Sequence, residues 1–455
     1  MAKVTIGCGA GFAGDRFDAA VPVVATLATL PGERFLIYEV LAERTLAIAQ
    51  KLRRADPEQG YSPFLDVYLP LVLADCKRHG IRIVSNMGAA NPLGAARRVH
   101  ALARELGIQG IKVAAVTGDD LLATISEAEV RAHPVIEGLE LGARAIVAAN
   151  AYLGAQPVAQ ALATCADVVL VGRTTDAALS LGPLMHVHGW REDQLDLLAQ
   201  GTLCGHLLEC GAQVSGAYFP DPGYKDVPDL ANVGFPIAEV ESNGDLIITK
   251  AGNTGGLVNR ATVIEQMLYE VHDPHNYLTP DVVLDLGEVT VDDVAPNRVS
   301  VLGARGKPAP QTLKATVCVD AGWLGEGEIS YAGPNALARA ELAASVVRER
   351  CRKIGVADPV RVDVLGTQAI FDDNSQTRRV RLFPSVDGEY RVRAAVRSAT
   401  RKIAQQVSDE VLSLYCSGPA GGAGVRQNVT AQVSTASILV DRAKVKAKVA
   451  LVEAV

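Results

Sequence analysis

The stretch Val4-Thr5-Ile6-Gly7-Cys8-Gly9-Ala10-Gly11-Phe12-Ala13-Gly14-Asp15-Arg16 opens a chain of 455 residues. Its apolar start predicts a short buried strand over residues 3–7, and the glycines after it predict a turn. Residues 19–30 then have the composition of a helix. A strand, a glycine-rich turn and a helix together direct backbone N–H groups towards an anion. This order of elements predicts an α/β fold.

Short apolar runs and helical segments continue to alternate along the N-terminal part of the chain. Strands are expected at residues 81–85, 111–116, 145–149 and 167–171, with helices at 43–54, 64–78 and 95–106. Such runs, each followed by small and polar residues and then a helix, are typical of parallel strands in βα units. We therefore predict a mostly parallel sheet of βα units that forms a large N-terminal domain over residues 1–287.

The C-terminal part has a different pattern, in which alternating polar and apolar residues predict several strands from about residue 288. Two long helices are expected there, at residues 335–354 and 393–415, with a strand at 360–365 between them. Strands combined with two long helices indicate a smaller α+β domain over residues 288–455.

Polar residues follow several of the predicted strands at the point where each strand ends. Ligands bind at the carboxyl ends of parallel strands, so we expect these residues to line one crevice. The candidate substrate-binding residues there are Gly11, Asp15, Arg16, Glu39, Asn86, Asn91, Arg173 and Thr174. Asp176 is a candidate catalytic residue that would orient the substrate. Asn91 is equally well explained as a helix N-cap.

The glycines of the first turn also fit the letters of a dinucleotide fingerprint, Gly9-x-Gly11-x-x-Gly14, with Glu39 as its acidic partner. Asp15 and Arg16 directly after the last glycine are not typical of that motif. A turn that lets a substrate approach the backbone is the preferred interpretation, because glycine has no side chain to block it. A nicotinamide cofactor remains the alternative.

A second stretch, Cys204-Gly-His-Leu-Leu-Glu-Cys210, brings together groups that carry out acid–base and nucleophilic chemistry. On a helix, His206, Glu209 and Cys210 meet on one face, which makes them candidate catalytic residues. The alternative is an ordinary core helix with two small buried cysteines. No second Cys/His pair lies nearby to complete a tetrahedral zinc site, so we assign no metal ligand.

A third candidate lies in the turn Lys250-Ala-Gly-Asn-Thr254-Gly255-Gly256. Lys250, Thr254 and Gly255 precede a predicted helix at residues 260–269 and could hold a phosphate or carboxylate. The order Gly-Lys-Ser/Thr of a Walker A loop is absent, which excludes that motif.

Composition limits the class of protein. Lys and Arg number 44 and Asp and Glu 51, a net charge of −7, which argues against nucleic acid as a partner. No run approaches the ~18 apolar residues of a membrane span, and the start has no signal-peptide h-region. The eight scattered cysteines suit free thiols in a reducing compartment. We expect a cytoplasmic homo-oligomer that binds a small molecule and no membrane.

Several motifs resemble, in order, those of the acyclic terpene utilisation AtuA family. They are Gly9-Ala-Gly-Phe-Ala-Gly-Asp-Arg16, Glu39-Val-Leu-Ala-Glu43, Asn86-Met-Gly-Ala-Ala-Asn-Pro92, Gly172-Arg-Thr-Thr-Asp176, Gly205-His-Leu-Leu-Glu-Cys-Gly211 and Phe235-Pro-Ile-Ala-Glu239. The resemblance spans most of the chain and implies an AtuA-type N-terminal domain followed by an AtuA-like C-terminal domain.

The resemblance implies a catabolic enzyme acting on a branched or terpenoid carboxylic acid or its acyl-CoA thioester. Lyase, hydratase or hydrolase chemistry by acid–base catalysis is the first hypothesis, with CoA as part of the substrate. A metal-assisted version would use His206, Glu209, Asp15 and Asp176 to hold Mg²⁺ or Mn²⁺. A non-catalytic subunit or scaffold of an acyl-CoA-processing complex is the second hypothesis, and a nicotinamide oxidoreductase is the third.

Overall fold

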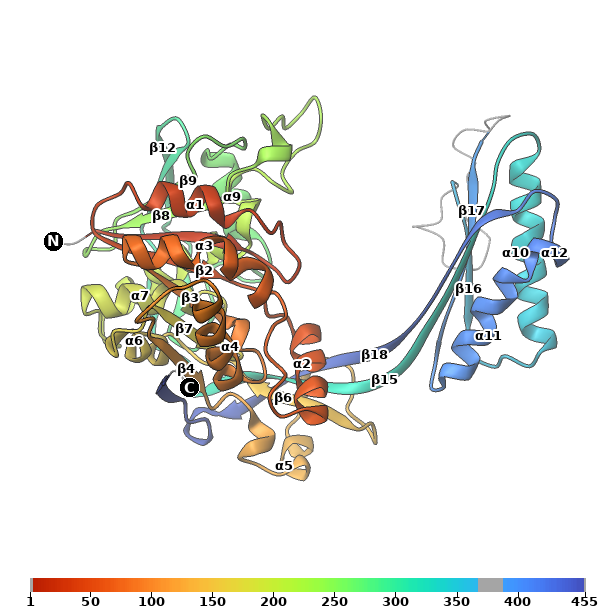
Figure 1. Ribbon diagram of the computed structural model, residues 1–455, viewed down its shortest axis with the longest axis horizontal. Helices are drawn as coiled ribbons and strands as arrows, with labels where there is room; N and C mark the ends of the chain where they lie inside the picture. The colour runs from red at the N-terminus through yellow and green to blue at the C-terminus, as the bar shows by residue number, and fades with distance from the viewer. Residues whose placement is uncertain (1–2, 367–387, 454–455) are drawn as a thin grey trace. The chain divides into compact units, whose positions relative to one another are not determined.

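The computed structural model describes residues 3–366 and 388–453 and divides the chain into two compact units (Figure 1). The first comprises Met1–Cys318 and Thr435–Val455, and the second Val319–Ser434. Each unit has a hydrophobic core of its own. The fold is mixed α/β, as the sequence predicts.

The first unit contains most of the secondary structure. Its strands are β1 (Val4–Ala10), β2 (Glu33–Tyr38), β3 (Ile81–Ser85), β4 (Val113–Thr117), β5 (Val135–Gly138), β6 (Ile146–Ala151), β7 (Val168–Val171), β8 (Pro236–Val240), β9 (Leu246–Lys250), β10 (Tyr277–Leu278), β11 (Val283–Asp285), β12 (Thr290–Ala295), β13 (Arg298–Leu302), β14 (Arg305–Lys307) and β19 (Lys448–Val452). Its helices are α1 (Ala20–Leu27), α2 (Glu43–Ala55), α3 (Leu65–His79), α4 (Pro92–Glu105), α5 (Glu127–Ala132), α6 (Gln156–Ala163), α7 (Ala178–His188), α8 (Leu195–Glu209) and α9 (Arg260–Leu268).

The main sheet has the strand order β12-β13-β9-β8-β1-β2-β3-β7-β4-β19. The central strands β1, β2, β3, β7 and β4 are parallel to one another. The strands outside them pair antiparallel, so the predicted mostly parallel sheet is instead mixed. One of these pairs has a local cause, because the Asn-Gly turn between β8 and β9 makes the predicted hairpin, and a hairpin can only be antiparallel.

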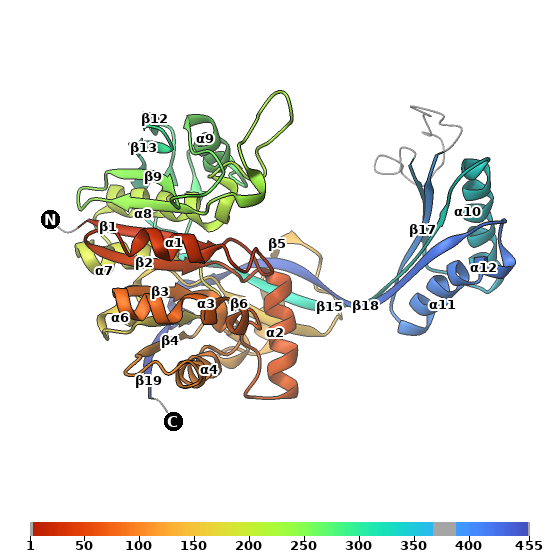
Figure 2. The same cartoon turned by 45° about the horizontal axis from the view of Figure 1, so that its top comes forward.

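Helices cover both faces of the parallel strands (Figure 2). Helix α3 contacts α1 and α4 on one face, and α7 contacts α6 and α8 on the other. Strand β1 is therefore buried along its whole length, as expected for a strand covered on both sides. Helix α8 is buried at every position from Leu198 to Glu209, because it packs between other elements on most of its circumference.

The first unit extends beyond residue 287, the end of the predicted N-terminal domain. Strands β12 and β13 add to the edge of the main sheet, and β14 joins β10 and β11 in a small three-stranded sheet. The two long strands β15 (Thr312–Tyr331) and β18 (Ala423–Asp441) then connect the two units. The boundary between the two units falls inside β15, after Cys318.

The second unit packs helices α10 (Ala336–Lys353) and α11 (Arg401–Leu412) against strands β16 (Val360–Leu365) and β17 (Tyr390–Ser398). Short helix α12 (Leu414–Ser417) follows α11. The helix predicted over residues 393–415 is wrong in its first part, which forms β17. Val392, Ala394 and Val396 are buried while Arg393 and Ala395 between them are only partly buried, and this period of two belongs to a strand.

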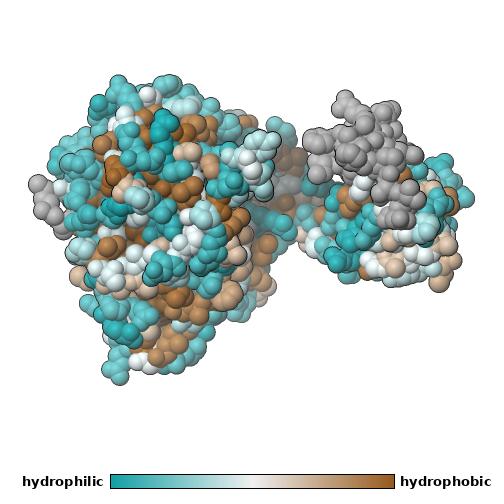
Figure 3. All heavy atoms as spheres, turned by 90° about the horizontal axis from the view of Figure 1, so that it is seen from above, coloured by the Kyte–Doolittle hydropathy of each residue, from teal (hydrophilic) through white to brown (hydrophobic). Residues whose placement is uncertain are grey.

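Within the described residues, no helix is both long and apolar enough to cross a bilayer. Hydrophobic and hydrophilic residues are interspersed on the face of the first unit that Figure 3 shows.

Candidate active site

Polar side chains from three parallel strands meet at the carboxyl edge of the main sheet. Glu39 follows β2, Asn86 follows β3, and Arg173 follows β7 by two residues. The strands β2, β3 and β7 are consecutive neighbours in the sheet. Their register therefore brings together residues that are 134 positions apart in sequence (173 − 39), as the βα pattern predicts.

Glu39 and Asn86 form a fixed pair at this edge. The Asn86 side-chain amide donates to Glu39 Oε1 over 2.7 Å, and its oxygen accepts the backbone N–H of Val40 at 2.8 Å. The backbone N–H of Leu41 donates to the same Glu39 oxygen at 3.1 Å. Asn86 is fully buried, so its role is to hold the carboxylate of Glu39 in one orientation.

Arg173 supplies a buried positive charge to the site. Only 2% of the residue is exposed, and its guanidinium donates to Asp176, to the carbonyl of Leu41 and to the carbonyl of Thr174. The guanidinium carbon also lies 4.4 Å from the centre of the Tyr152 ring, a cation–π arrangement. These contacts hold Arg173 in place, so its buried positive charge offsets the negative charges of the neighbouring carboxylates.

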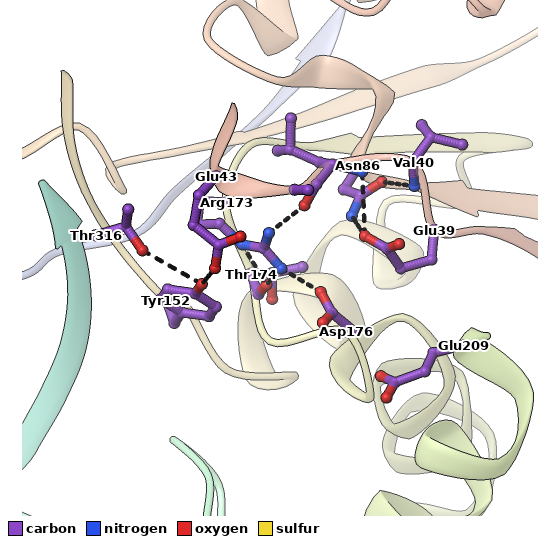
Figure 4. Close-up of polar contacts among 12 residues, drawn as sticks. Glu39, Val40, Glu43, Asn86, Tyr152, Arg173, Thr174, Asp176, Glu209 and Thr316 are labelled. Atoms are coloured by element: carbon purple, nitrogen blue, oxygen red, sulfur yellow. Dashed lines mark hydrogen bonds and ion pairs between the residues drawn. The ribbon is translucent and has the colours of Figure 1, made fainter. Parts of the chain in front are cut away.

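Asp176 lies between Glu39 and Glu209 in the close-up, with its carboxylate towards Arg173 (Figure 4). Burial raises the pKa of Asp176 well above its ordinary value; Arg173 opposes the shift, and Glu39, Glu209 and Glu43 add to it. Burial likewise raises the pKa of Glu39, with Glu209 adding to the effect and Arg173 and Asn86 opposing it. The side chain of Asp176 is nevertheless 37% exposed. We call Glu39, Asp176 and Glu209 the acid cluster.

Glu209 is held by His206, one turn earlier on α8. His206 Nδ1 lies 3.0 Å from Glu209 Oε1, and Nε2 lies 3.2 Å from the carbonyl oxygen of Met267. Its ring is 5.5 Å from that of Tyr277, centre to centre. The helical spacing predicts this pair correctly, but both ring nitrogens already have partners. His206 therefore orients Glu209 and has no free nitrogen for a metal ion.

The metal-assisted hypothesis has little support from the geometry. Among the described residues, no group of three or more His, Cys, Asp and Glu side chains is arranged to hold a metal ion. Asp15, one of the four suggested ligands, uses its carboxylate within its own turn.

That turn is closed from within by Asp15. Its Oδ2 accepts the backbone N–H of Gly11 at 2.9 Å, and its Oδ1 accepts that of Arg16 at 2.7 Å. A Cβ at Gly11 would lie 2.4 Å from the backbone of Cys210 and Gly211. Glycine is thus needed for the approach to the end of α8, and a protein carboxylate occupies the N–H groups that a pyrophosphate would require.

Cys210 directly follows the last residue of α8 and is partly exposed. Burial, with the charge of Glu209 adding to it, raises the pKa of its thiol strongly. Because the thiolate is the nucleophile, this environment does not activate Cys210. Cys204 is buried inside the helix, in agreement with the interpretation as a small core residue.

The remaining candidates make contacts that hold the fold. Asn91 caps α4 by accepting the N–H of Gly94 at 3.0 Å, as its position before Pro92 suggests. Lys250 donates to the carbonyl of Thr254 at 2.7 Å and so folds back on its own turn, while Gly255 bridges to Val233. Arg16 pairs with Asp18 at 2.8 Å.

Two residues beside Arg173 were not among the predicted site residues. The Tyr152 hydroxyl donates to Glu43 in a short hydrogen bond and accepts from Thr316 at 3.3 Å (Figure 4). Burial favours a higher pKa for Glu43, but the Tyr152 hydrogen bond and the charge of Arg173 outweigh it, so the pKa of Glu43 is lowered.

The model of the acyclic terpene utilisation family protein AtuA matches residues 4–451, nearly the whole chain. The chain belongs to the AtuA family. No curated protein and no solved structure gives a significant match. Membership in the AtuA family implies a role in acyclic terpene utilisation. The order of motifs along the sequence therefore predicts the family correctly.

One family motif contains one of the two residues, Glu43 and Tyr152, that the sequence-based prediction missed. Glu43 is the last residue of the AtuA motif Glu39-Val-Leu-Ala-Glu43, and it enters the site because β2 ends before it and α2 starts at it. Tyr152 directly follows β6, two residues after Asn150. A search for polar residues at strand ends could have found both. The arrangement offers two carboxyl groups with raised pKa values beside one fixed cation.

Proposed function

We propose that this AtuA-family chain is an acid–base enzyme that adds water to, or removes it from, a branched terpenoid carboxylic acid or its acyl-CoA thioester. One observation carries the proposal. Asp176 has a raised pKa, keeps more than a third of its side chain exposed, and lies beside Glu39. Perturbed carboxyl groups that a substrate can reach are typical of general acids and bases.

The roles follow from which group keeps its proton. The charge of Glu39 adds to the raised pKa of Asp176, so we assign Asp176 as the proton-carrying acid and Glu39 as the base. In a hydration, Glu39 takes a proton from water, the water oxygen bonds to the β carbon of the unsaturated substrate, and Asp176 gives its proton to the α carbon. The reverse reaction returns the proton to Asp176 and releases water. Arg173 and Asn86 are positioning residues.

The experiment is a turnover assay of the purified full-length chain with branched 2-enoyl-CoA thioesters and the matching free acids, with products identified by mass spectrometry. We expect Asp176→Asn and Glu39→Gln each to lower kcat about 10²-fold or more, the range typical of a general acid or base. Glu58→Gln is the matched control, since Glu58 is an exposed carboxylate that pairs with Arg97 on the surface.

The pH dependence separates this role from a structural one. If protonated Asp176 is the acid, kcat/KM falls as the pH rises through its raised pKa, and Asp176→Asn removes that limb. Full activity of the Asp176→Asn variant would contradict the proposal. Absence of turnover on every thioester and acid, together with co-purification of another protein, would favour the non-catalytic subunit.

A further inference from the structure

A cavity that lies apart from the acid cluster is found in the first unit, at the carboxyl end of β4. Its volume is about 460 Å³, within the range of small-molecule sites. Its walls come from the end of β4, the loop before α4, the end of β6 and the segment leading into β19. Figure 2 shows β4, β19 and α4 side by side. The proposed reaction uses no residue of this cavity.

The cavity is lined by more positive than negative groups. Arg53, Lys444, Lys446 and Lys448 face Asp119 and Asp120, a balance of 4 − 2 = +2 in a chain whose net charge is −7. Arg53 donates to the carbonyl of Ala90 at 2.6 Å and lies 3.7 Å from Asp120. Lys444 pairs with Glu129 at 2.5 Å.

Lys446 and Lys448 differ from these two cations. Both are exposed, and within the described residues neither has an acidic partner at ion-pair distance. Lys448 is the first residue of β19, and its backbone pairs with Thr117 at the end of β4. The sheet thus places the backbone of Lys448 at the edge of the cavity. A ligand can bind the ammonium groups of Lys446 and Lys448 without displacing an acidic partner.

The cavity is coupled to the acid cluster by short contacts. Asp119 in its wall accepts the backbone N–H of Arg173 at 2.9 Å, and Arg173 contacts Asp176. Helix α2 covers the same edge: Glu43 at its start bonds Tyr152, and Arg53 in its last turn lines the cavity. At 1.5 Å per residue, these two residues are about 15 Å apart along the helix.

We propose that this cavity binds the phosphate groups of the substrate, which makes a CoA thioester and not the free acid the substrate class. The inference rests on the proposed function. Lysine binds a phosphate oxygen as a point charge, and arginine binds phosphate through the forked donors of its guanidinium. The extended arm of CoA separates its phosphates from the reacting acyl group. A small free acid has no phosphate to place in a cationic cavity that lies apart from the acid cluster.

The test measures binding without turnover, by calorimetry on the full chain at low salt. The probes are CoA, inorganic pyrophosphate, and pantetheine, which lacks phosphate. The variant is Lys446→Ala/Lys448→Ala, and the matched control is Lys353→Ala/Lys402→Ala, which removes two exposed lysines from the second unit. We expect CoA to bind, the cavity variant to weaken binding at least tenfold, the control to leave it unchanged, and added salt to reduce it.

The outcomes distinguish whether the cavity binds anions at all from whether its ligand is CoA. Pyrophosphate binding that depends on the two lysines, without CoA binding, would keep the anion site but overturn CoA as its ligand. Equal affinity of CoA for both double variants, or no binding of either anion, would overturn the site. Hydration of a free acid by a protein that binds no phosphate would leave the proposed function standing while removing this inference.

Discussion

His206 and Glu209 lie one turn apart on α8, with Nδ1 of the imidazole 3.0 Å from Oε1 of the carboxylate and its other nitrogen facing the carbonyl of Met267. Both partners accept hydrogen bonds, so a ring that carries a proton on each nitrogen can donate to both of them. This contact holds the imidazole and the carboxylate in fixed orientations at the end of α8.

The first prediction concerns the pH dependence of this pair. Burial disfavours the charged ring, but the hydrogen bond and charge of Glu209 outweigh it, so the pKa of His206 is raised above 6.5. A group whose pKa is higher in the folded than in the unfolded state stabilises the fold. This stabilisation is complete below the pKa of the unfolded state and is lost as the pH rises through the pKa of the folded state. We expect the free energy of unfolding to fall above pH 6.5 in the wild type.

Urea unfolding between pH 5 and 9 measures this effect, and His206→Gln should abolish that part of the slope. His79→Gln, on an exposed histidine at the end of α3, is the control. The same slope in His206→Gln as in the wild type would contradict the prediction.

The second prediction concerns the buried charge of Arg173. Arg173→Met leaves Asp176 and the carbonyls of Leu41 and Thr174 without their donor, and removing one partner of a buried ion pair costs about 3–5 kcal/mol. Because Asp176 is partly exposed, the lower end of that range is expected. Adding Asp176→Asn should recover part of the loss, and a double-mutant cycle measures the coupling. Strict additivity would show that the two residues do not interact.

The third prediction concerns Asp119, which lines the cationic cavity and accepts the backbone N–H of Arg173. Burial raises the pKa of Asp119 from 3.8 to about 6. The contribution of protonated Asp119 to the free energy of unfolding is therefore complete below pH 3.8 and is lost as the pH rises through about 6. A shift of about two pKa units corresponds to roughly 3 kcal/mol. Stability of Asp119→Asn relative to wild type should rise by that order between pH 4 and 7. A constant difference across this range would disprove it.

The fourth prediction concerns the first glycine turn. Gly11→Ala places a Cβ 2.4 Å from the backbone of Cys210, so it should destabilise the protein by about 1–3 kcal/mol, as overpacking does. Gly252→Ala is the matched control, because the nearest atom to its Cβ is the Thr26 hydroxyl at 3.6 Å. Thermal melting compares the two, and equal melting temperatures would mean that the turn can move away from α8.

The local patterns of the sequence were sufficient for much of this structure. Ile81–Ser85 and Val360–Leu365 form strands with the predicted bounds, and the Asn-Gly turn makes its hairpin. These features depend on residues close together in the chain. The strand at residues 390–398 was missed because a run of apolar and basic residues fits a helix until burial shows a period of two.

Some of the polar residues expected at the strand ends come together in the structure, and others do not. Glu39, Asn86, Arg173 and Asp176 do meet, since residues after neighbouring parallel strands must lie at one edge. Lys250 and Asn91 do not join them, because a lysine or an asparagine beside a turn finds backbone carbonyls or N–H groups within its own loop. The position of Asn91 before Pro92 suggests its role as a cap, but nothing in the local sequence shows that Lys250 folds back on its own turn.

The sequence by itself determined the family, the alternation of strands and helices, and the helical pairing of His206 with Glu209, all of which follow from spacing along the chain. Tertiary structure alone decided that Asp15 closes the glycine turn, that Glu43 and Tyr152 flank Arg173, and that lysines from residues 444–448 line a cavity with Arg53. The physical reason is burial: a carboxylate or a guanidinium taken out of water must find partners, and the sheet order, not the sequence distance, determines which ones are near.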